Sequence, residues 1–165
     1  MGLSEDLELI ARQERELTFS SFDETTAWEL GMSLRKLAVE LSLQVVIDVR
    51  RFGQPLFYAA LAGTTPDNVE WVRRKNNVVA RFHRSSYAVG LKLKLKNETL
   101  QQQSGLPLAD YATHGGAFPI AVNGAGVIGS VTVSGLPQRA DHDLVVKALC
   151  LLLNRDYGQL QLASE

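Results

Sequence analysis

The hydrophobic positions of the chain follow two periods, one typical of helices and one typical of strands. Between residues 66 and 82, Trp71, Val78 and Phe82 belong to an apolar set that recurs every three or four positions, which predicts an amphipathic helix. Thr65 can cap this helix, and Pro66 suits its first position, where a missing amide hydrogen costs nothing. The middle of the chain is therefore expected to be helical.

Helical periodicity also predicts elements on either side of this central helix. Ser21 and Glu24 have the spacing of a capping box in front of a helix of about five turns. Ser4 can cap a short N-terminal helix, and Asp141 is the expected cap of a last helix over residues 141–154. The apolar face expected for the helix after Glu24 comprises Trp28, Met32, Leu34, Leu37, Ala38 and Leu41.

Strand-like segments come in two pairs, each joined by a short polar connection. Asn123-Gly124-Ala125-Gly126 is a strong hairpin signal, and the other connection contains Gly53. Alternation in the first strand places Asp48 on one face and Ile47 on the other. Residues 16–19 are also short and strand-like. The paired segments are residues 44–51 with 55–62, and residues 118–122 with 127–134.

The sequence pattern does not decide the secondary structure of two segments. Residues 86–96 fit a second helix capped by Ser85 or Ser86, but the run from Gly90 to Lys96 also alternates like a strand, and periodicity does not decide between them. Residues 97–116 show no period, and a loop of this length in a small domain is often functional.

The elements predict an α/β protein of the α+β kind, with a mainly antiparallel sheet of about five strands and packed helices. The 165 residues and the 45% hydrophobic content suit one domain over residues 1–165, with residues 1–20 as a peripheral N-terminal arm. No apolar run approaches the length of a membrane span, the start lacks the pattern of a signal peptide, and the single Cys150 lies in an apolar run. These features indicate a cytoplasmic protein without a membrane partner.

Charge is distributed unevenly. Ten of the 17 Lys and Arg residues lie between positions 50 and 96, against only Asp67 and Glu70. This basic middle is either a set of solvated helix faces or an anion site. Nucleic-acid binding is not expected, because the whole chain has a net charge of -1 and carries no recognised nucleic-acid motif.

Several strings in the chain resemble the GlcG and HbpS-like family, whose domain is also called the haem-degrading domain. They cover most of the chain, from about Asp23 to Leu153. The resemblance implies a profilin-like fold, assembly into even-numbered homo-oligomers and, in some members, haem binding. The strings are Val-Val-Ile-Asp-Val-Arg-Arg (45–51), Gly-Thr-Thr-Pro-Asp-Asn (63–68), Trp-Val-Arg-Arg-Lys-Asn (71–76), Arg-Phe-His-Arg-Ser-Ser-Tyr (81–87), His-Gly-Gly-Ala-Phe-Pro-Ile (114–120) and Thr-Val-Ser-Gly-Leu-Pro-Gln (132–138).

The resemblance also indicates binding residues. Four features are shared with the family. The central helix carries a lysine, Lys75, and a Gly-Gly pair, Gly115 and Gly116, precedes a strand. The next strand ends in Val-Ser-Gly at residues 133–135, and an acid, Asp141, opens the last helix. Residues that this branch adds are Arg50, Arg51, Trp71, Arg73, Arg74, His83 and His114, and Asn76 completes the candidate set.

The histidines are the candidate metal or haem ligands. His114 comes first, because the adjacent glycines can shape a concavity around it, although it also fits an ordinary turn. His83 comes second, since a histidine at a helix end more often satisfies terminal carbonyls. His142 is expected to be a surface residue of the last helix. Trp71 and Tyr87 can stack on a flat ligand or belong to the core.

Two functional hypotheses remain. In the first, the protein is a homo-oligomeric binding protein for haem, another tetrapyrrole or a small anionic metabolite. In the second, it is a protein-interaction or scaffold module without a small-molecule ligand, and the arginines form ion pairs across a subunit interface. Haem degradation is the one enzymatic activity that the resemblance implies, and no serine-elbow, zinc or dinucleotide motif supports catalysis.

Overall fold

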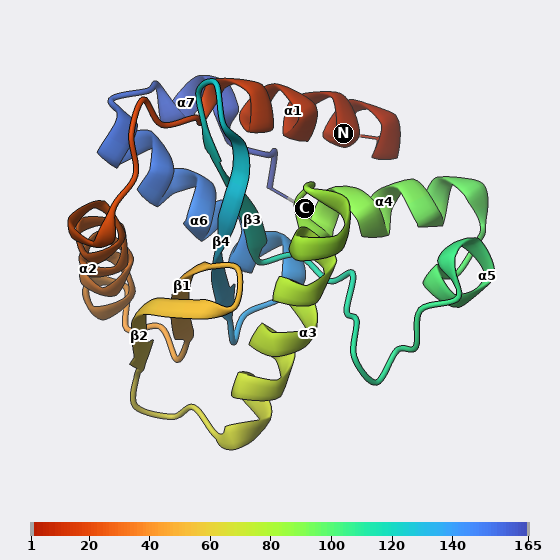
Figure 1. Ribbon diagram of the computed structural model, residues 1–165, viewed down its shortest axis with the longest axis horizontal. Coiled ribbons are helices and arrows are strands. Elements are labelled where there is room, and N and C mark those ends of the chain that lie inside the picture. The colour runs from red at the N-terminus through yellow and green to blue at the C-terminus, as the bar shows by residue number, and fades with distance from the viewer. Residues whose placement is uncertain (1, 165) are drawn as a thin grey trace.

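Four antiparallel strands form one sheet with helices on both of its faces (Figure 1). The structure is a computed structural model and describes residues 2–164. Within these residues the elements are α1 (Leu3–Glu16), α2 (Glu24–Glu40), β1 (Val46–Arg51), β2 (Gln54–Ala60), α3 (Pro66–Phe82), α4 (Ser86–Lys96), α5 (Leu100–Ser104), β3 (Ala117–Val122), β4 (Gly126–Ser134), α6 (Gln138–Leu153) and α7 (Tyr157–Leu160).

The sheet has the strand order β2-β1-β4-β3, so two hairpins lie side by side and meet at β1 and β4. Both hairpins predicted from the sequence are confirmed. The sheet has four strands and not five, because residues 16–19 contribute only a single parallel bridge between Phe19 and Val122. The α+β class with an antiparallel sheet is therefore correct, and the expected fifth strand is wrong.

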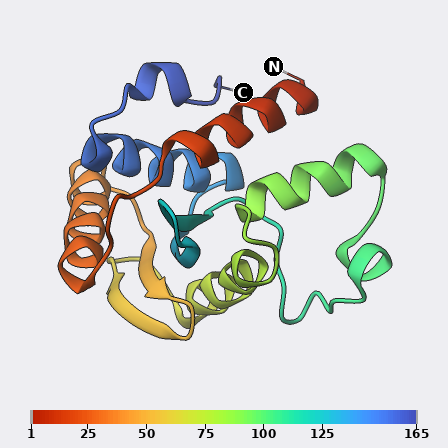
Figure 2. The same ribbon diagram turned by 45° about the horizontal axis from the view of Figure 1, so that its top comes forward.

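The two faces of the sheet have different partners, as alternation in β1 predicts. Val45, Ile47 and Val49 are fully buried in the main core, which α2 and α6 complete. Asp48 points to the other face, where it accepts a hydrogen bond from Asn76 of α3. The helix α3 crosses this second face, as Figures 1 and 2 both show.

The N-terminal segment contributes to the interior. Ile10 is fully buried in a second, smaller core together with residues of α4. Gln13 is also fully buried, and its side-chain amide donates to the carbonyl of Leu160 at 2.6 Å. Leu17 and Phe19 join the main core. With Asp6, the segment expected to be a peripheral arm therefore places five side chains inside the protein.

Helix boundaries differ from the predicted caps. Asp23 caps α2 and forms its capping box with Thr26, so the predicted Ser21–Glu24 box is wrong. Gly2, not Ser4, occupies the N-cap position of α1. The helix α6 begins at Gln138 behind Pro137, which places Asp141 in the first turn and not at the cap. Short polar residues are frequent before helices, so the local pattern alone selects among neighbours poorly.

Two segments were left unclear by the sequence, and the structure shows the first as a helix and the second as a loop that contains a short helix. Residues 86–96 form α4, and Ser85 caps it by accepting from the amide of Ala88. Residues 97–116, expected to lack structure, contain the short helix α5. None of the helices in the described part of the chain is long and apolar enough to cross a bilayer.

Candidate functional site

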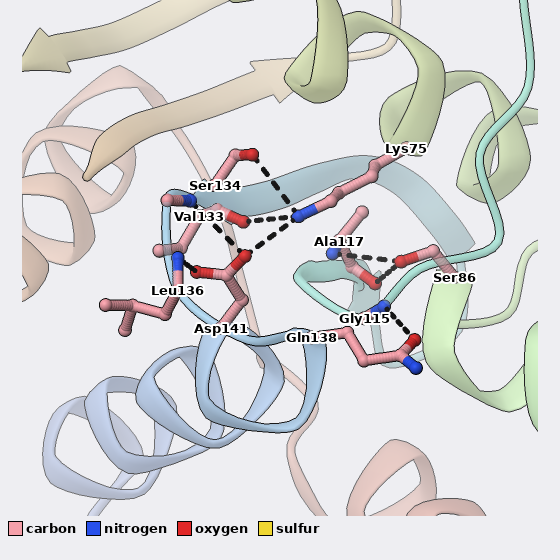
Figure 3. A network of polar contacts seen from close by, with 10 residues as sticks. Lys75, Ser86, Gly115, Ala117, Val133, Ser134, Leu136, Gln138 and Asp141 are labelled. Carbon is pink, nitrogen blue, oxygen red and sulfur yellow. Dashed lines mark hydrogen bonds and ion pairs between the residues drawn. The ribbon is translucent and has the colours of Figure 1, made fainter. Parts of the chain in front are cut away.

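A buried ion pair joins α3 to the start of α6. The Lys75 ammonium donates to Asp141 Oδ2 at 3.0 Å, to the Val133 carbonyl at 3.2 Å and to Ser134 Oγ at 3.4 Å (Figure 3). The Asp141 carboxylate also accepts from the amide of Leu136 at 3.0 Å. Lys75 is on the apolar side of α3, as the helical period predicts, and both side chains are almost completely buried. The pair thus links α3, β4 and α6.

The partners of the pair match its ionised form. Burial lowers the pKa of Lys75 and raises the pKa of Asp141, and the attraction between the two charges opposes both shifts. Three acceptors surround the ammonium, and backbone amides donate to the carboxylate. Hydrogen bonds of this kind favour the charged forms and oppose the effect of burial.

The two glycines before β3 permit close contacts around this pair. A Cβ on Gly116 would lie 2.3 Å from the Val133 carbonyl oxygen and 2.8 Å from Lys75 Nζ, and the residue has a φ of +135°. A Cβ on Gly115 would lie 2.3 Å from the Gln138 carbonyl oxygen. The amide of Gly115 donates to Gln138 Oε1 at 3.3 Å. The glycines therefore allow the chain to pass between Lys75 and the start of α6.

His114 stands beside the ion pair at the protein surface. Its ring lies edge-on to Trp71, with 4.9 Å between ring centroids, and the Arg74 guanidinium lies 4.7 Å from the centroid of the same tryptophan. Burial, with smaller contributions from Lys75 and Arg74, lowers the pKa of His114 below its usual value. The imidazole is therefore neutral at neutral pH, and one ring nitrogen keeps a lone pair for a metal or a hydrogen-bond donor.

Two cavities share His114 and Gln138 in their walls. The smaller, of about 250 Å³, contains the ion pair and Trp71. The larger, of about 490 Å³, extends toward Tyr87 and Lys94. Five of the sequence-predicted residues therefore meet around one surface depression, namely Lys75, His114, Gly115, Gly116 and Asp141. The complete lining of the smaller cavity is Asp67, Asn68, Trp71, Lys75, His114, Ser134, Gly135, Leu136, Gln138 and Asp141.

Arg50 and Asn76 belong to a neighbouring polar network. The Arg50 guanidinium binds both oxygens of Asp48, with two nitrogen–oxygen distances of 2.7 Å, and this contact raises the pKa of Arg50. Asn76 donates to Asp48 and accepts from Ser130 at 2.8 Å and from Thr132. These partners satisfy both residues from within the chain, so they hold α3 against the sheet.

The other candidate arginines do not line either cavity. Arg51 pairs with Glu24 of α2. Arg73 donates to Asp110 at 3.0 Å, and the guanidinium of Arg74 donates to the Leu108 carbonyl at 2.8 Å. Both residues thereby attach the loop after α5 to α3.

His83, the second metal candidate, lies at the opposite end of α3 from Trp71. It ends the helix in a left-handed conformation with a φ of +55° and stacks on Phe52. His83 follows Trp71 by twelve positions, which corresponds to about 18 Å along the helix axis. His83 and His114 therefore do not share a site, and the residues from 2 to 164 include no cluster of three or more ligating side chains for a metal ion.

The prediction that His142 is a surface residue is wrong. It is fully buried, its Nε2 lies 2.8 Å from Gln13 Oε1, and its ring packs against Tyr87 and Phe118. Because α6 begins at Gln138, His142 falls three residues before Val145 on the inner face of that helix. With the helix start at Gln138, His142 falls within the helix, where its spacing from Val145 predicts burial.

Comparisons with known proteins agree on the family. The family model described as "Haem degrading protein HbpS-like" matches residues 22–150. A protein of Acidobacterium capsulatum named "UPF0303 protein" is 63% identical over 162 residues, which cover 98% of each chain. The crystal structure of the Ybr137w protein has a TM-score of 0.83 and 29% identity, and the match covers 90% of this chain and 87% of that chain.

A more distant solved structure has the same fold. The structure titled PduOC:Heme complex matches with a TM-score of 0.65 and 16% identity, over 81% of this chain and 94% of that chain. At 16% identity, this match is evidence for a shared fold alone. The family match over residues 22–150 and the full-length similarity to the A. capsulatum protein show that this chain belongs to the HbpS-like family.

Proposed function

We propose that this protein binds a small ligand at the depression around His114, with haem or another tetrapyrrole as the first candidate and a small anionic metabolite as the second. The observation that carries the proposal is the position of His114. A neutral imidazole stands where two cavities share a wall, beside the aromatic surface of Trp71. A cavity with a few polar groups and a histidine of altered pKa is typical of binding sites.

The residues around the depression fit a tetrapyrrole. His114 supplies a nitrogen lone pair of the kind that holds haem iron, and Tyr87 and Trp71 add aromatic surface. Lys94, in the wall of the larger cavity, supplies a positive charge suited to a propionate. The PduOC:Heme complex shares the fold, which supports haem as the first ligand to test.

We infer binding and not catalysis. Asp141 and Lys75, which line the smaller cavity together with His114, are both engaged with each other and with backbone groups. A general acid or base must be free to exchange a proton with its substrate. The two residues are thus better suited to shaping the site than to turnover.

Titration of haem into the apo-protein tests the proposal. We expect a saturable Soret band with one haem per chain, and His114→Ala should raise the dissociation constant about tenfold or more because the axial nitrogen is lost. His83→Asn is the matched control, since it removes a histidine from the far end of α3 while asparagine tolerates the left-handed backbone there. Equal affinity for wild type and His114→Ala would contradict the assignment of the axial ligand.

The second ligand class requires a separate measurement. If haem gives no saturable band, phosphate and small carboxylates should raise the thermal midpoint of wild type more than that of His114→Ala. The absence of a shift with all of these probes would overturn the ligand proposal.

A protein-interaction module without a small-molecule ligand is the second candidate function. The observation in its favour is the exposed apolar face of α2, where Trp28 and Met32 reach the surface. The arginines expected at a subunit interface are instead bound within the chain, Arg73 by Asp110 and Arg51 by Glu24. An interaction surface is therefore better sought on α2.

A further inference from the structure

The two cavities that share His114 differ in the charge of their walls. The wall of the larger cavity carries two cations, Lys94 and Arg139, and one acid, Asp6. The wall of the smaller cavity carries two acids and one cation. An excess of one sign of charge attracts the opposite charge into a cleft. The negative end of a ligand in this depression is therefore better suited to the larger cavity.

The arginine in the wall of the larger cavity is already bound to a carboxylate. Arg139 Nη1 donates to Asp6 Oδ2 at 2.7 Å, and Arg139 Nη2 donates to Asp6 Oδ1 at 3.1 Å. The Arg139 side chain is 15% exposed and that of Asp6 is 6% exposed. Two such contacts form the bidentate fork by which a guanidinium recognises a carboxylate. The geometry of Arg139 thus matches a carboxylate, and Asp6 occupies the position of one.

Contacts other than Asp6 also orient the Arg139 guanidinium. Its Nε donates to the carbonyl of Ala163 at 2.9 Å, and its Nη1 lies 3.4 Å from the Tyr87 hydroxyl, to which it donates. These contacts hold the fork toward the cavity when Asp6 leaves it. Lys94, the second cation in the wall, makes no ion pair within residues 2–164.

Asp6 lies in the first turn of a terminal helix, which makes it displaceable. Gly2 and Ser164 line the same cavity, and Figure 2 shows the two ends of the chain on the same side of the molecule. The first turn of α1 has its own cap, because Glu5 accepts from the amide of Gly2 at 2.8 Å. Segments at chain ends open at the lowest cost in free energy, whereas the fully buried Ile10 holds the rest of α1 in place.

We propose that Arg139 is the carboxylate-binding residue of the larger cavity and that Asp6 is an internal competitor, which the carboxylate of a ligand replaces. This inference rests on the proposed function, since it concerns the same depression, and it assigns a ligand class. The ligand is an organic acid whose carboxylate binds Arg139 and whose apolar body packs against Tyr87 and Leu91 in the cavity wall. Its apparent affinity is reduced by the fraction of molecules in which Asp6 occupies the guanidinium.

A matched pair of probes tests the competition. Naphthoate carries a carboxylate on an aromatic body, and naphthamide is its neutral amide. In isothermal titration calorimetry, Asp6→Asn should lower the dissociation constant of naphthoate about tenfold or more, because the competing charge is gone. The dissociation constant of naphthamide should not change.

Glu8→Gln is the matched control for the loss of a negative charge. Glu8 lies on the same helix, is exposed and makes no ion pair within residues 2–164. Its replacement should leave naphthoate binding unchanged, whereas a general field effect would strengthen binding in both variants.

The double variant Asp6→Asn/Arg139→Gln shows whether the gain depends on the guanidinium. It leaves no buried ion without a partner, so it avoids the folding defect expected of Arg139→Gln alone. It should bind naphthoate at least about tenfold more weakly than Asp6→Asn does. Circular dichroism should show that each variant is folded.

Four results would each overturn the proposal. They are no naphthoate binding by Asp6→Asn, equal naphthoate affinity of Asp6→Asn and wild type, an equal gain for naphthamide or in Glu8→Gln, and a gain that persists in the double variant. A buried ion pair with a purely structural role gives the second of these results together with a loss of stability.

Repeating the titration in the His114→Ala background separates this inference from the proposed function. The ratio of dissociation constants between the chains with and without Asp6→Asn should be retained, because no contact between Asp6 and Arg139 involves His114. A retained ratio without a saturable Soret band would overturn haem binding alone. A saturable Soret band with equal naphthoate affinities would overturn the role of Asp6 alone.

Discussion

The loss of a lysine affects stability differently at a buried and at an exposed position, and Lys75 is the buried case. On the sequence it is one cation among ten in the middle of the chain. In the structure it is buried with Asp141, whereas Lys36, paired with Glu40 at 3.9 Å, is solvent-exposed. A buried ion that loses its partner remains desolvated and uncompensated, but an exposed one returns to water. The two lysines therefore form a natural test and control.

Breaking the buried pair should destabilise the protein strongly. Lys75→Met leaves the Asp141 carboxylate without its cation, and we expect urea denaturation to show a free energy of unfolding lower by about 3–5 kcal/mol. Asp141→Asn should have a similar effect. The double variant should lose about 1–3 kcal/mol less than the sum of the two single losses, because neither ion is then left unpaired. Lys36→Met should cost less than about 1 kcal/mol. Additive losses at Lys75 and Asp141 would contradict the coupling.

Two constraints act on Gly116, a positive φ and close packing, and a comparison with Gly124 separates them. Gly116→Ala adds a Cβ against the Val133 carbonyl and Lys75 Nζ at a positive φ, and it should lower the free energy of unfolding by about 2–4 kcal/mol. Gly124 also has a positive φ, but nothing lies within 4 Å of its added Cβ, so Gly124→Ala should cost only about 1 kcal/mol. Equal losses in thermal or urea unfolding would show that backbone strain alone governs Gly116.

At the scale of elements, the sequence predicts types well and boundaries poorly. Alternation and turn signals located both hairpins, because strand faces and tight turns leave a local pattern. Helix caps depend on which residue precedes the first free amides: Asp23 caps α2 with its side chain, whereas Gly2 at the N-cap position of α1 makes no side-chain cap. Because α6 was expected to begin at Asp141, His142 was predicted to be a surface residue, and that prediction is wrong.

Helical periodicity also overstated the buried face of α2. Trp28 and Met32 share a period with Leu34 and Ala38, but the first pair is exposed and the second is fully buried. Apolar residues on two sides of a helix are indistinguishable from one broad face until a partner is known. Trp28 and Met32 therefore lie outside the main core, although the helical period groups them with it.

At the scale of the whole molecule, the sequence predicted which residues are chemically distinctive but not which of them meet. Lys75, Gly116 and Asp141 lie far apart in the chain and converge because α3, β3 and α6 pack around the end of β4. Arg73 and Arg74 belong to the same helix as Lys75 but donate to Asp110 and Leu108 in the loop after α5. Local patterns define the face of an element, and only the tertiary arrangement decides what that face contacts.

The burial of His142 connects one side chain to the stability of the entire fold. Burial, with a smaller contribution from Arg139, lowers the pKa of His142 to about 3, and Asp6 opposes the shift. In the unfolded chain a histidine has a pKa of about 6.5. Between these values the unfolded state binds one more proton than the folded state. Stability from this group is therefore complete above about pH 6.5 and is lost as the pH falls toward 3.

We expect the free energy of unfolding to decrease from pH 6.5 to pH 5, with His142 contributing up to about 2 kcal/mol of that decrease. His142→Gln keeps a polar partner for Gln13 and cannot titrate, so its decrease over the same interval should be smaller by about that amount. Val145→Ala, one turn further along α6, should lower stability equally at both pH values because it removes only buried apolar surface. If urea denaturation gave the same pH dependence for His142→Gln and the wild type, the neutral buried histidine would be excluded as the cause.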